Sequence, residues 1–576
     1  MKKNTLQKVL ATALVSTMAM GALTACGGEA APEASAPAKE ESSAASESTP
    51  AESTPAETVA GIEGFVPFES TVTLQIPIYQ RATPNGAADA GDNYWTNWVQ
   101  ENFGDKYNID VEYITLDRGQ ENEQYALLAA AGKLPVCCFE YDYPDVTLYQ
   151  NEGYLQEYDI DWFKQIAPTY WQRMVDNGLD AYTEINGENV LLVGSRAYGN
   201  TNYQFTTFYR QDWVEAAGFT EYPSDPDELM KLYAKIAELG LGGEHFLGGT
   251  KIEGNGADQN YPYRTYPMDE LTWATTGDYV IPALSTEAQK ALLKKQNELY
   301  NLGYIDPEYN TRTSDFAVSD FVSGQVFTYS CYSTAKNDVL DQFYAANPDA
   351  HLGIVVNPGP MTFADGTCTA YRPNGDCGQY IGFSSQATEE QMKAFAMYLE
   401  WMCQDDVFFT LKYGLEGINF NYDADGNPVY VEDQTGLAEQ QGHNNNVDMW
   451  CLVEASAAAT GDAEKDIKSC APVGYPDSDK FAEQIWANYQ GQLACFEAGM
   501  VAPDCKFGVT IAASDEYKDT LFAKYAELRD KIVMGSVDDF EANYEAASKE
   551  YLAAGYQAII DEKAEAYNSG ATTHLR

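Results

Sequence analysis

Apolar and polar residues alternate along residues 71–78, with Val72, Leu74, Ile76 and Ile78 at the even positions. A period of two residues is typical of a strand that buries one face. The alternation returns over residues 109–113, and residues 136–139 form a short apolar run. The pattern therefore predicts three strands in this part of the chain.

Two helical patterns separate these strands. Aromatic residues between 94 and 103 recur near helical spacing, and the Ala- and Leu-rich stretch 124–131 ends before Gly132 and Pro135, which stop helices. This order of elements predicts an open α/β sheet with crossover helices. Ligands of such sheets bind beyond the carboxyl ends of the strands. Here those ends are residues 79–81 and 140–143.

Two later stretches carry helix-start signals. Asp225 is followed three residues later by Glu228, and Thr388 is followed three residues later by Gln391. A capping side chain with an acidic or amide residue three positions further on marks the start of a helix. We expect amphipathic helices after both, reaching Leu239 in the first case and covering residues 392–402 in the second.

The N-terminus is typical of an exported protein. Three lysines precede an apolar run over residues 9–23, which is too short and too rich in small polar residues for a membrane span. The run leads into Leu23-Thr24-Ala25-Cys26, which resembles the bacterial lipobox. That resemblance implies that residues 1–25 are a signal peptide and that Cys26 is lipidated. An ordinary secretory signal with an incidental cysteine is the alternative.

Composition restricts the partners. Residues 26–64, which start at the lipidated cysteine, form a linker of mainly Ala, Pro, Ser, Thr and Glu that buries too little surface to fold. A chain of 576 residues can form more than one domain or lobe, and its net charge of -52 repels nucleic acid and anionic lipid headgroups. We therefore expect no nucleic-acid partner, and membrane contact through the lipid anchor only, on the extracellular face of the bacterial cell membrane.

Candidate chemistry points to binding rather than catalysis. Aromatic residues make up 13% of the chain, with 41 tyrosines, and such rings stack on flat, hydroxyl-rich ligands as well as filling cores. The four histidines are scattered, so we expect no metal site and no cofactor. The sequence contains no Gly-x-Ser-x-Gly, His-Glu-x-x-His or phosphate-loop motif.

Four segments resemble, in the same order, those of extracellular solute-binding proteins of ABC importers. They are Leu-Leu-Ala-Ala-Ala-Gly-Lys-Leu-Pro at 127–135, Tyr-Arg-Gln-Asp-Trp at 209–213, Leu-Tyr-Asn-Leu-Gly-Tyr-Ile-Asp-Pro-Glu at 299–308 and Tyr-Gly-Leu-Glu-Gly at 413–417. The likeness runs from about residue 70 to the C-terminus and is to the long, Firmicutes-like members of family 1, the carbohydrate type. Val136 departs from the pattern, because the family usually has Asp there.

This resemblance implies an α/β, two-lobe, periplasmic-binding-protein-like fold of type 2, with discontinuous lobes joined by hinge crossings. We expect crossings at residues 194–208, at 326–332 and near Gly382. The corresponding limits put 65–200 and 330–382 in lobe 1, and 201–329 and 383–576 in lobe 2.

The resemblance also implies a function. The protein would be a monomeric substrate-binding lipoprotein, not an enzyme, that closes on a small solute and delivers it to an ABC transporter permease. We expect an oligosaccharide as the solute, and a neutral one if the acidity extends to the cleft. Alternatives are a secreted glycan-active hydrolase, which needs two nearby carboxylates, an importer component for peptides or other small molecules, and an adhesin.

Ligand contacts are expected from aromatic and planar polar side chains at strand ends, crossings and loops. The candidates are Arg81, Trp95, Tyr141, Asp142, Tyr203, Arg210, Trp273, Tyr332 and Trp450.

Several of these candidates also have structural interpretations. Trp95 and Trp98 lie on one predicted helix, and at least one is expected in the core. An internal ion pair with Asp212 is the favoured role of Arg210. Trp273, in a predicted loop, and Tyr332, at a predicted crossing, are the stronger candidates.

Overall fold

The computed structural model describes residues 62, 64–80, 89–195, 205–223, 225–248, 270–277, 281–312, 314–332, 337–355, 377–422, 424, 426, 428–431, 434, 436–440, 447–453, 490, 494 and 505–575. Glu57–Arg576 forms one compact unit. The predicted signal peptide, Cys26 and most of the predicted linker lie outside the described residues. None of the described helices is both long enough and apolar enough to cross a membrane.

The first two predicted strands are present and pair in parallel. β1 (Val72–Gln80) and β2 (Ile109–Asp117) pair along their whole length, from Val72 opposite Ile109 to Gln80 opposite Asp117. Their connection contains the predicted helix, as α1 (Tyr94–Val99), a π-helical turn (Gln100–Gly104) and α2 (Asp105–Tyr107). Because the strands are parallel, their carboxyl ends lie at the same edge.

The third predicted strand lies in a separate three-stranded sheet. β3 (Cys137–Glu140) follows α3 (Glu121–Ala131) and pairs antiparallel with β10 (Cys377–Phe383), which pairs on its other side with β6 (Leu191–Ser195). The N–H of Val136 donates to the carbonyl of Gln75 at 2.8 Å, which links the start of β3 to β1. Between β3 and β6 lie α4 (Tyr143–Asn151), α5 (Ile160–Ile166), α6 (Pro168–Asp176), a 3-10 turn (Leu179–Tyr182), β4 (Glu184–Ile185) and β5 (Glu188–Asn189).

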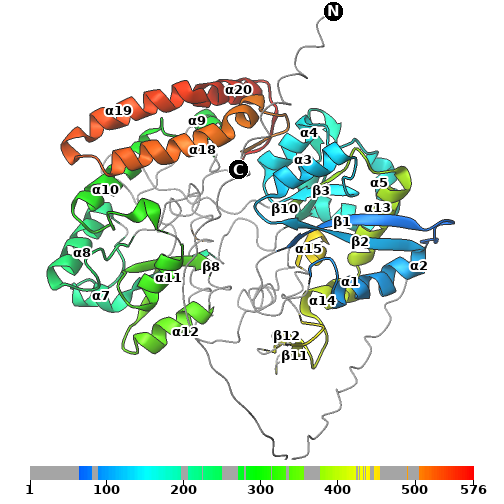
Figure 1. Cartoon of the computed structure of the whole chain (residues 1–576), viewed down its shortest axis with the longest axis horizontal. Coiled ribbons are helices and arrows are strands. Elements are labelled where there is room, and N and C mark those ends of the chain that lie inside the picture. Colours follow the sequence, from blue (N-terminus) through cyan, green and yellow to red (C-terminus); the bar gives the residue numbers. More distant parts are fainter. Residues whose placement is uncertain are drawn as a thin grey trace, which may run out of the picture. The chain divides into compact units, whose positions relative to one another are not determined.

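Helix α13 (Glu389–Met402) packs against β1, although more than 300 residues separate them, and Figure 1 shows it beside the blue and cyan elements. Its start is the predicted capping box. The Thr388 hydroxyl accepts from the Gln391 N–H, and the Gln391 side chain accepts from the Thr388 N–H. After α13 come α14 (Asp405–Tyr413), β11 (Phe420–Tyr422), β12 (Pro428–Tyr430) and α15 (Val447–Trp450).

An aromatic cluster attaches α13 to the β1–β2 layer. The ring of Trp401 lies 5.8 Å from that of Trp98 and 5.2 Å from that of Phe103, centroid to centroid. The hydroxyls of Tyr398 and Tyr113 are 3.0 Å apart. All five side chains are buried. The cluster therefore couples α13 to β2 and to the helical connection before it.

A third sheet has β7 (Phe205–Arg210) at its centre, paired antiparallel with β8 (Thr328–Tyr332) and β9 (Leu352–Val355). Helix α8 (Pro226–Leu239) confirms the predicted helix start at Asp225, because the Asp225 side chain accepts from two N–H groups of the first turn. The other helices of this segment are α7 (Gln211–Ala216), α9 (Glu270–Thr276), α10 (Glu287–Asn301), α11 (Ser314–Val322) and α12 (Asn337–Ala346).

The C-terminal helices α18 (Ala512–Val533) and α19 (Phe540–Tyr551) share a core with α8, α10 and Tyr209 of β7. Figure 1 shows the orange and red helices next to the green α10, which α18 contacts. Helix α20 (Gln557–Asn568) packs on α9, and β13 (Cys505–Phe507) pairs with β14 (Thr572–Leu575). This segment also reaches α4, because Lys518 pairs with Asp145 at 2.7 Å.

These pairings differ from the expected lobe limits. β8 and β9 pair with β7, whereas the limits put 330–382 with 65–200. The pairing of β10 with β3 and β6 agrees with the limits, which put 377–382 with 65–200. Helix α13 packs against β1, whereas the limits put 383–576 with 201–329. The physical reason is that the alternation within a strand specifies its buried face but does not identify its partner strand.

Truncation of Trp401 tests the aromatic cluster. Trp401→Ala should lower the free energy of unfolding by roughly 3–5 kcal/mol, as expected for loss of a fully buried large aromatic side chain. Urea unfolding followed by circular dichroism measures the change. Leu127→Ala, whose wild-type side chain is 71% exposed, is the matched control and should change stability by about 0.5 kcal/mol or less. Equal stability of the two variants would contradict the packing described.

Candidate ligand-binding site

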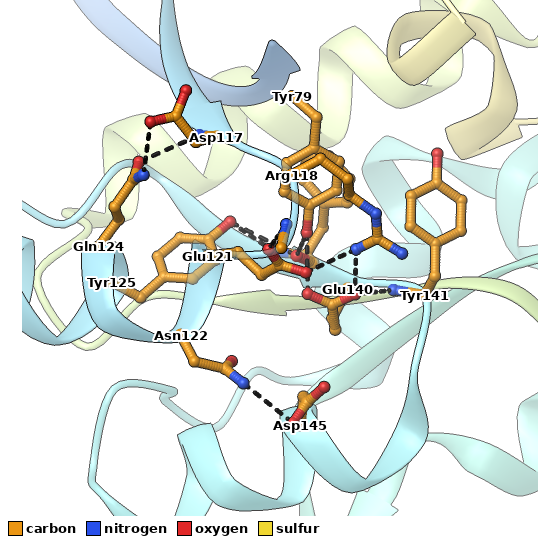
Figure 2. A network of polar contacts seen from close by, with 12 residues as sticks. Tyr79, Asp117, Arg118, Glu121, Asn122, Gln124, Tyr125, Glu140, Tyr141 and Asp145 are labelled. Carbon is orange, nitrogen blue, oxygen red and sulfur yellow. Dashed lines mark hydrogen bonds and ion pairs between the residues drawn. The ribbon is translucent and has the colours of Figure 1, made fainter. Parts of the chain in front are cut away.

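Three strand ends meet around one buried carboxylate. Tyr79 is the penultimate residue of β1, Arg118 directly follows β2, and Glu140 is the last residue of β3. Figure 2 shows these side chains directed toward one another. The ends of the first and third strands were predicted from the sequence to bind the ligand. The structure brings both ends together with the end of the second strand.

Glu140 has no exposed surface. Its Oε1 accepts from Arg118 Nη1 at 2.9 Å and from the Tyr141 N–H at 2.7 Å, and its Oε2 accepts from the Tyr79 hydroxyl at 2.9 Å. Burial raises the pKa of the Glu140 carboxyl to about 7, although the charge of Arg118 opposes the shift. The group therefore titrates near neutral pH while bound to three donors.

Arg118 is the cation of this network. The same Nη1 that contacts Glu140 also pairs with Glu121 Oε1 at 2.7 Å. Its guanidinium carbon lies 4.9 Å from the ring centre of Tyr79 and 4.8 Å from that of Tyr141, within cation–π range. The Arg118 side chain is nevertheless 34% exposed, so the network extends from the buried Glu140 to the surface.

Asp448 fixes the position of Tyr141 from far along the chain. Its Oδ1 accepts from the Tyr141 hydroxyl at 2.7 Å, and its Oδ2 accepts from the Tyr79 N–H at 3.0 Å. Asp448 is buried in α15, which also carries Trp450. Two of the predicted residues therefore lie at these strand ends: Tyr141, which Asp448 holds, and its neighbour Asp142.

Three carboxylates near the start of α4 could in principle hold a metal ion. One oxygen each of Glu140, Asp142 and Asp145 lies within 4.8 Å of the others. However, Asp145 is paired with Lys518 at 2.7 Å and bonded to Asn122 at 3.1 Å, and Glu140 is paired with Arg118. Cations of the chain itself already neutralise two of the three groups, so the arrangement is an ion-pair network.

Trp95 and Arg210 have structural roles. Trp95 is fully buried, with its ring 6.3 Å from that of Trp98, which is also buried. The Arg210 Nε donates to Asp212 Oδ1 at 2.8 Å, and its guanidinium lies over the ring of Trp213. From the sequence, at least one of Trp95 and Trp98 was expected in the core, and the ion pair with Asp212 was the favoured role of Arg210.

The remaining candidates are distributed over the chain. Trp273 is a buried residue of helix α9 rather than part of a loop, and Trp450 is also buried. Tyr332 ends β8, where it pairs with Phe205. Arg81 and Tyr203 are not among the described residues. All of these assignments to the ligand stay predictions.

Sequence reasoning missed Arg118, Glu121 and Asp448. The strand-end rule could have identified Arg118, because it directly follows the second predicted strand. Asp448 carried no local signal, since its two partners, Tyr79 and Tyr141, lie more than 300 residues away.

No family model matches the chain, and no curated protein matches it. Solved structures do match. An "HMO binding ABC-transporter associated Solute Binding Protein" from Bifidobacterium longum infantis is 15% identical, with a TM-score of 0.58 over 87% of this chain and 99% of its own.

Two further structures match at similar length. The alginate-binding protein AlgQ2, solved without calcium ion, is 14% identical, with a TM-score of 0.56 over 88% of this chain and 100% of its own. The S. pneumoniae ABC-transporter substrate binding protein FusA, in complex with kestose, is 13% identical, with a TM-score of 0.52 over 86% and 100%. The chain thus has the fold of these solute-binding proteins, and the predicted α/β, two-lobe class is confirmed.

The pKa of Glu140 gives a pH prediction. Because the folded-state pKa is raised from 4.5 to about 7, the folded state binds a proton that the unfolded state has released. The stability contributed by this group is complete below pH 4.5 and is lost as the pH rises to about 7. In Glu140→Gln this loss should be absent.

Urea unfolding of wild type and of Glu140→Gln from pH 4 to pH 8 isolates the contribution of Glu140 to the free energy of unfolding, because the two proteins have every other titratable group in common. The stability of wild type relative to Glu140→Gln should fall between about pH 4.5 and 7 and then level off. A relative stability that stays level between pH 4.5 and 7, and rises with pH only below pH 4.5, would mean that Arg118 dominates and lowers the pKa instead.

Proposed function

We propose that this protein is the substrate-binding lipoprotein of an ABC importer, and that it captures an oligosaccharide and delivers it to a membrane permease. The observation that carries the proposal is the fold match over 86–88% of this chain. The three matched structures are named for binding HMO, alginate and kestose, and two of them for ABC transporters.

Closure of two lobes is the proposed mechanism. The strand pairings support one lobe from residues 64–195 and 377–453. The pairings of β7 and the core that α8 and α10 share with α18 and α19 support a second lobe from residues 205–355 and 505–575. The chain would then cross between the lobes three times. A ligand that contacts both lobes stabilises the closed state, because only that state supplies both sets of contacts.

The strand ends around Glu140 are the proposed contribution of the first lobe. Arg118 and Tyr141, which are both partly exposed, come from the edge at which α/β sheets bind ligands. They combine a cation with an aromatic ring, which suits a ligand with flat faces and many hydroxyls.

A hydrolase is the competing proposal, and the geometry of Glu140 counts against it. A glycosidase needs a carboxylic acid of raised pKa that reaches the glycosidic oxygen. Glu140 has the raised pKa, but it has no exposed surface and all three of its bonds lead to protein donors. Its proton cannot reach a substrate while those bonds persist.

Anchoring through Cys26 completes the proposal. Residues 1–25 would be removed as a signal peptide, and the linker would hold a monomeric binding unit on the extracellular face of the bacterial membrane, near the permease. The supporting observations are the basic start, the short apolar run and the Leu-Thr-Ala-Cys sequence.

Thermal unfolding tests the ligand class. The purified protein is mixed in turn with neutral oligosaccharides, uronic-acid oligosaccharides and short peptides, and each mixture is assayed for turnover. A ligand at about 100 times its Kd should add roughly 2.7 kcal/mol of stability, which raises the Tm by several degrees. A shift with oligosaccharides and no hydrolysis is expected. A shift with peptides alone, or hydrolysis of the bound glycan, would overturn the function.

Metabolic labelling with palmitate in a bacterial host tests the anchor. Wild type should incorporate the label and fractionate with membranes. Cys26→Ala should incorporate none and retain residues 1–25, because lipidation precedes cleavage at a lipobox. Cys505→Ala is the control and should label like wild type. Equal labelling of Cys26→Ala and wild type would exclude Cys26 as the lipidation site.

A further inference from the structure

One edge of the Arg118 guanidinium makes no hydrogen bond to the residues that the structure describes. Both of its ion pairs, to Glu140 and to Glu121, are made through Nη1. In the part of the chain that the structure describes, Nε and Nη2 of Arg118 make no hydrogen bond, and Figure 2 draws none from them. These two nitrogens form the side edge of the guanidinium, where two donors point the same way.

Arg210 shows what this edge does when an acceptor is present. Its Nε donates to Asp212 Oδ1 at 2.8 Å and its Nη2 donates to Asp212 Oδ2 at 2.5 Å. At Arg210 the same two donors are therefore satisfied by a carboxylate of the protein itself. At Arg118 the pair is available, on a side chain that is 34% exposed.

The unused edge is also held in place. Nη1 is fixed by two carboxylates, and the guanidinium lies near the rings of Tyr79 and Tyr141. The Tyr141 ring is itself held by Asp448. Little side-chain freedom remains to be lost when the edge binds a ligand, so each hydrogen bond contributes more to affinity.

The charge around Arg118 determines whether the two acceptors on the ligand are the oxygens of a carboxylate or two hydroxyl groups. The single charge of Arg118 already faces two carboxyl groups, those of Glu140 and Glu121, at 2.9 and 2.7 Å. A ligand carboxylate would add a further negative charge to this group, and like charges at short range repel. Two neighbouring hydroxyls accept the same two hydrogen bonds without adding charge.

We propose that Arg118 is the residue that determines specificity at this site, and that its Nε and Nη2 donate to two neighbouring hydroxyls on one ring of a neutral oligosaccharide. This assignment of Arg118 rests on the proposed function. It restricts the ligand to neutral glycans that present two neighbouring hydroxyls on one ring. Glu140 and Glu121 are positioning residues, since they act by holding Arg118.

Calorimetric titration of the purified protein tests this. One set of probes is neutral (maltotriose, kestose, xylotriose and lacto-N-tetraose) and the other is acidic (trigalacturonic acid and an alginate trisaccharide). The variant Arg118→Lys keeps the charge but loses the paired donors. The control is Arg312→Lys, because Arg312 pairs only with Asp306 and Asp320 among the described residues.

At least one neutral probe should bind wild type, and Arg118→Lys should bind it roughly 10- to 100-fold more weakly, as expected for one lost hydrogen bond from a charged donor, since Lys can still donate one of the two. Arg312→Lys should bind within about twofold of wild type, since it leaves the site intact. Equal binding by Arg118→Lys, or binding of the acidic probes only, overturns the proposal while keeping the importer function. Binding of neither set overturns the proposed function and this proposal with it.

A second measurement uses only wild type, in case Arg118→Lys does not fold. Phenylglyoxal modifies exposed guanidinium groups, and mass spectrometry of the peptide that contains Arg118 reports the extent. The neutral probe that binds should slow modification of Arg118 and leave Arg312 unchanged. Undiminished modification of Arg118 in the presence of a bound probe would contradict the contact.

Discussion

The charge of Glu140 is the constraint on which the strand-end region depends. A buried carboxylate costs several kcal/mol unless its charge and its lone pairs are satisfied. Its three partners are Arg118, the Tyr141 N–H and the Tyr79 hydroxyl. These groups come from the ends of three strands, so the strands cannot separate without leaving a charge unpaired. The bonds that satisfy Glu140 also hold Arg118 still.

Distant parts of the chain complete this arrangement. Asp448 bonds to both Tyr79 and Tyr141, and Lys518 pairs with Asp145 at the start of α4. A continuous N-terminal domain could not supply these partners. The discontinuity of the fold therefore serves the site directly, because segments that return late in the chain fix residues that are placed early. In the proposed mechanism, the two bonds of Asp448 keep the ligand-facing edge rigid while the crossings between lobes bend, and the Lys518–Asp145 pair joins the two lobes.

Local patterns in the sequence predicted the local elements. The alternation at Val72–Ile78 and the capping residues Asp225 and Thr388 depend on neighbours only, and the structure confirms all three. Partnership between distant segments was not predictable in this way. Nothing in strand β9 indicates that it joins β7 rather than β3. The burial of individual tryptophans was not predictable either. Trp273 is of a residue type that is typical of binding sites, but it lies buried on a helix.

The most direct test of the central claim is a crystal structure of the protein grown with the neutral oligosaccharide mixture. The account predicts one sugar ring at the ends of β1, β2 and β3, with two adjacent hydroxyls within hydrogen-bond distance of Nε and Nη2 of Arg118. The Glu140 carboxylate should keep its three protein donors in that complex. A glycan bound elsewhere on the protein, with the Arg118 edge making no contact to it, would contradict the account.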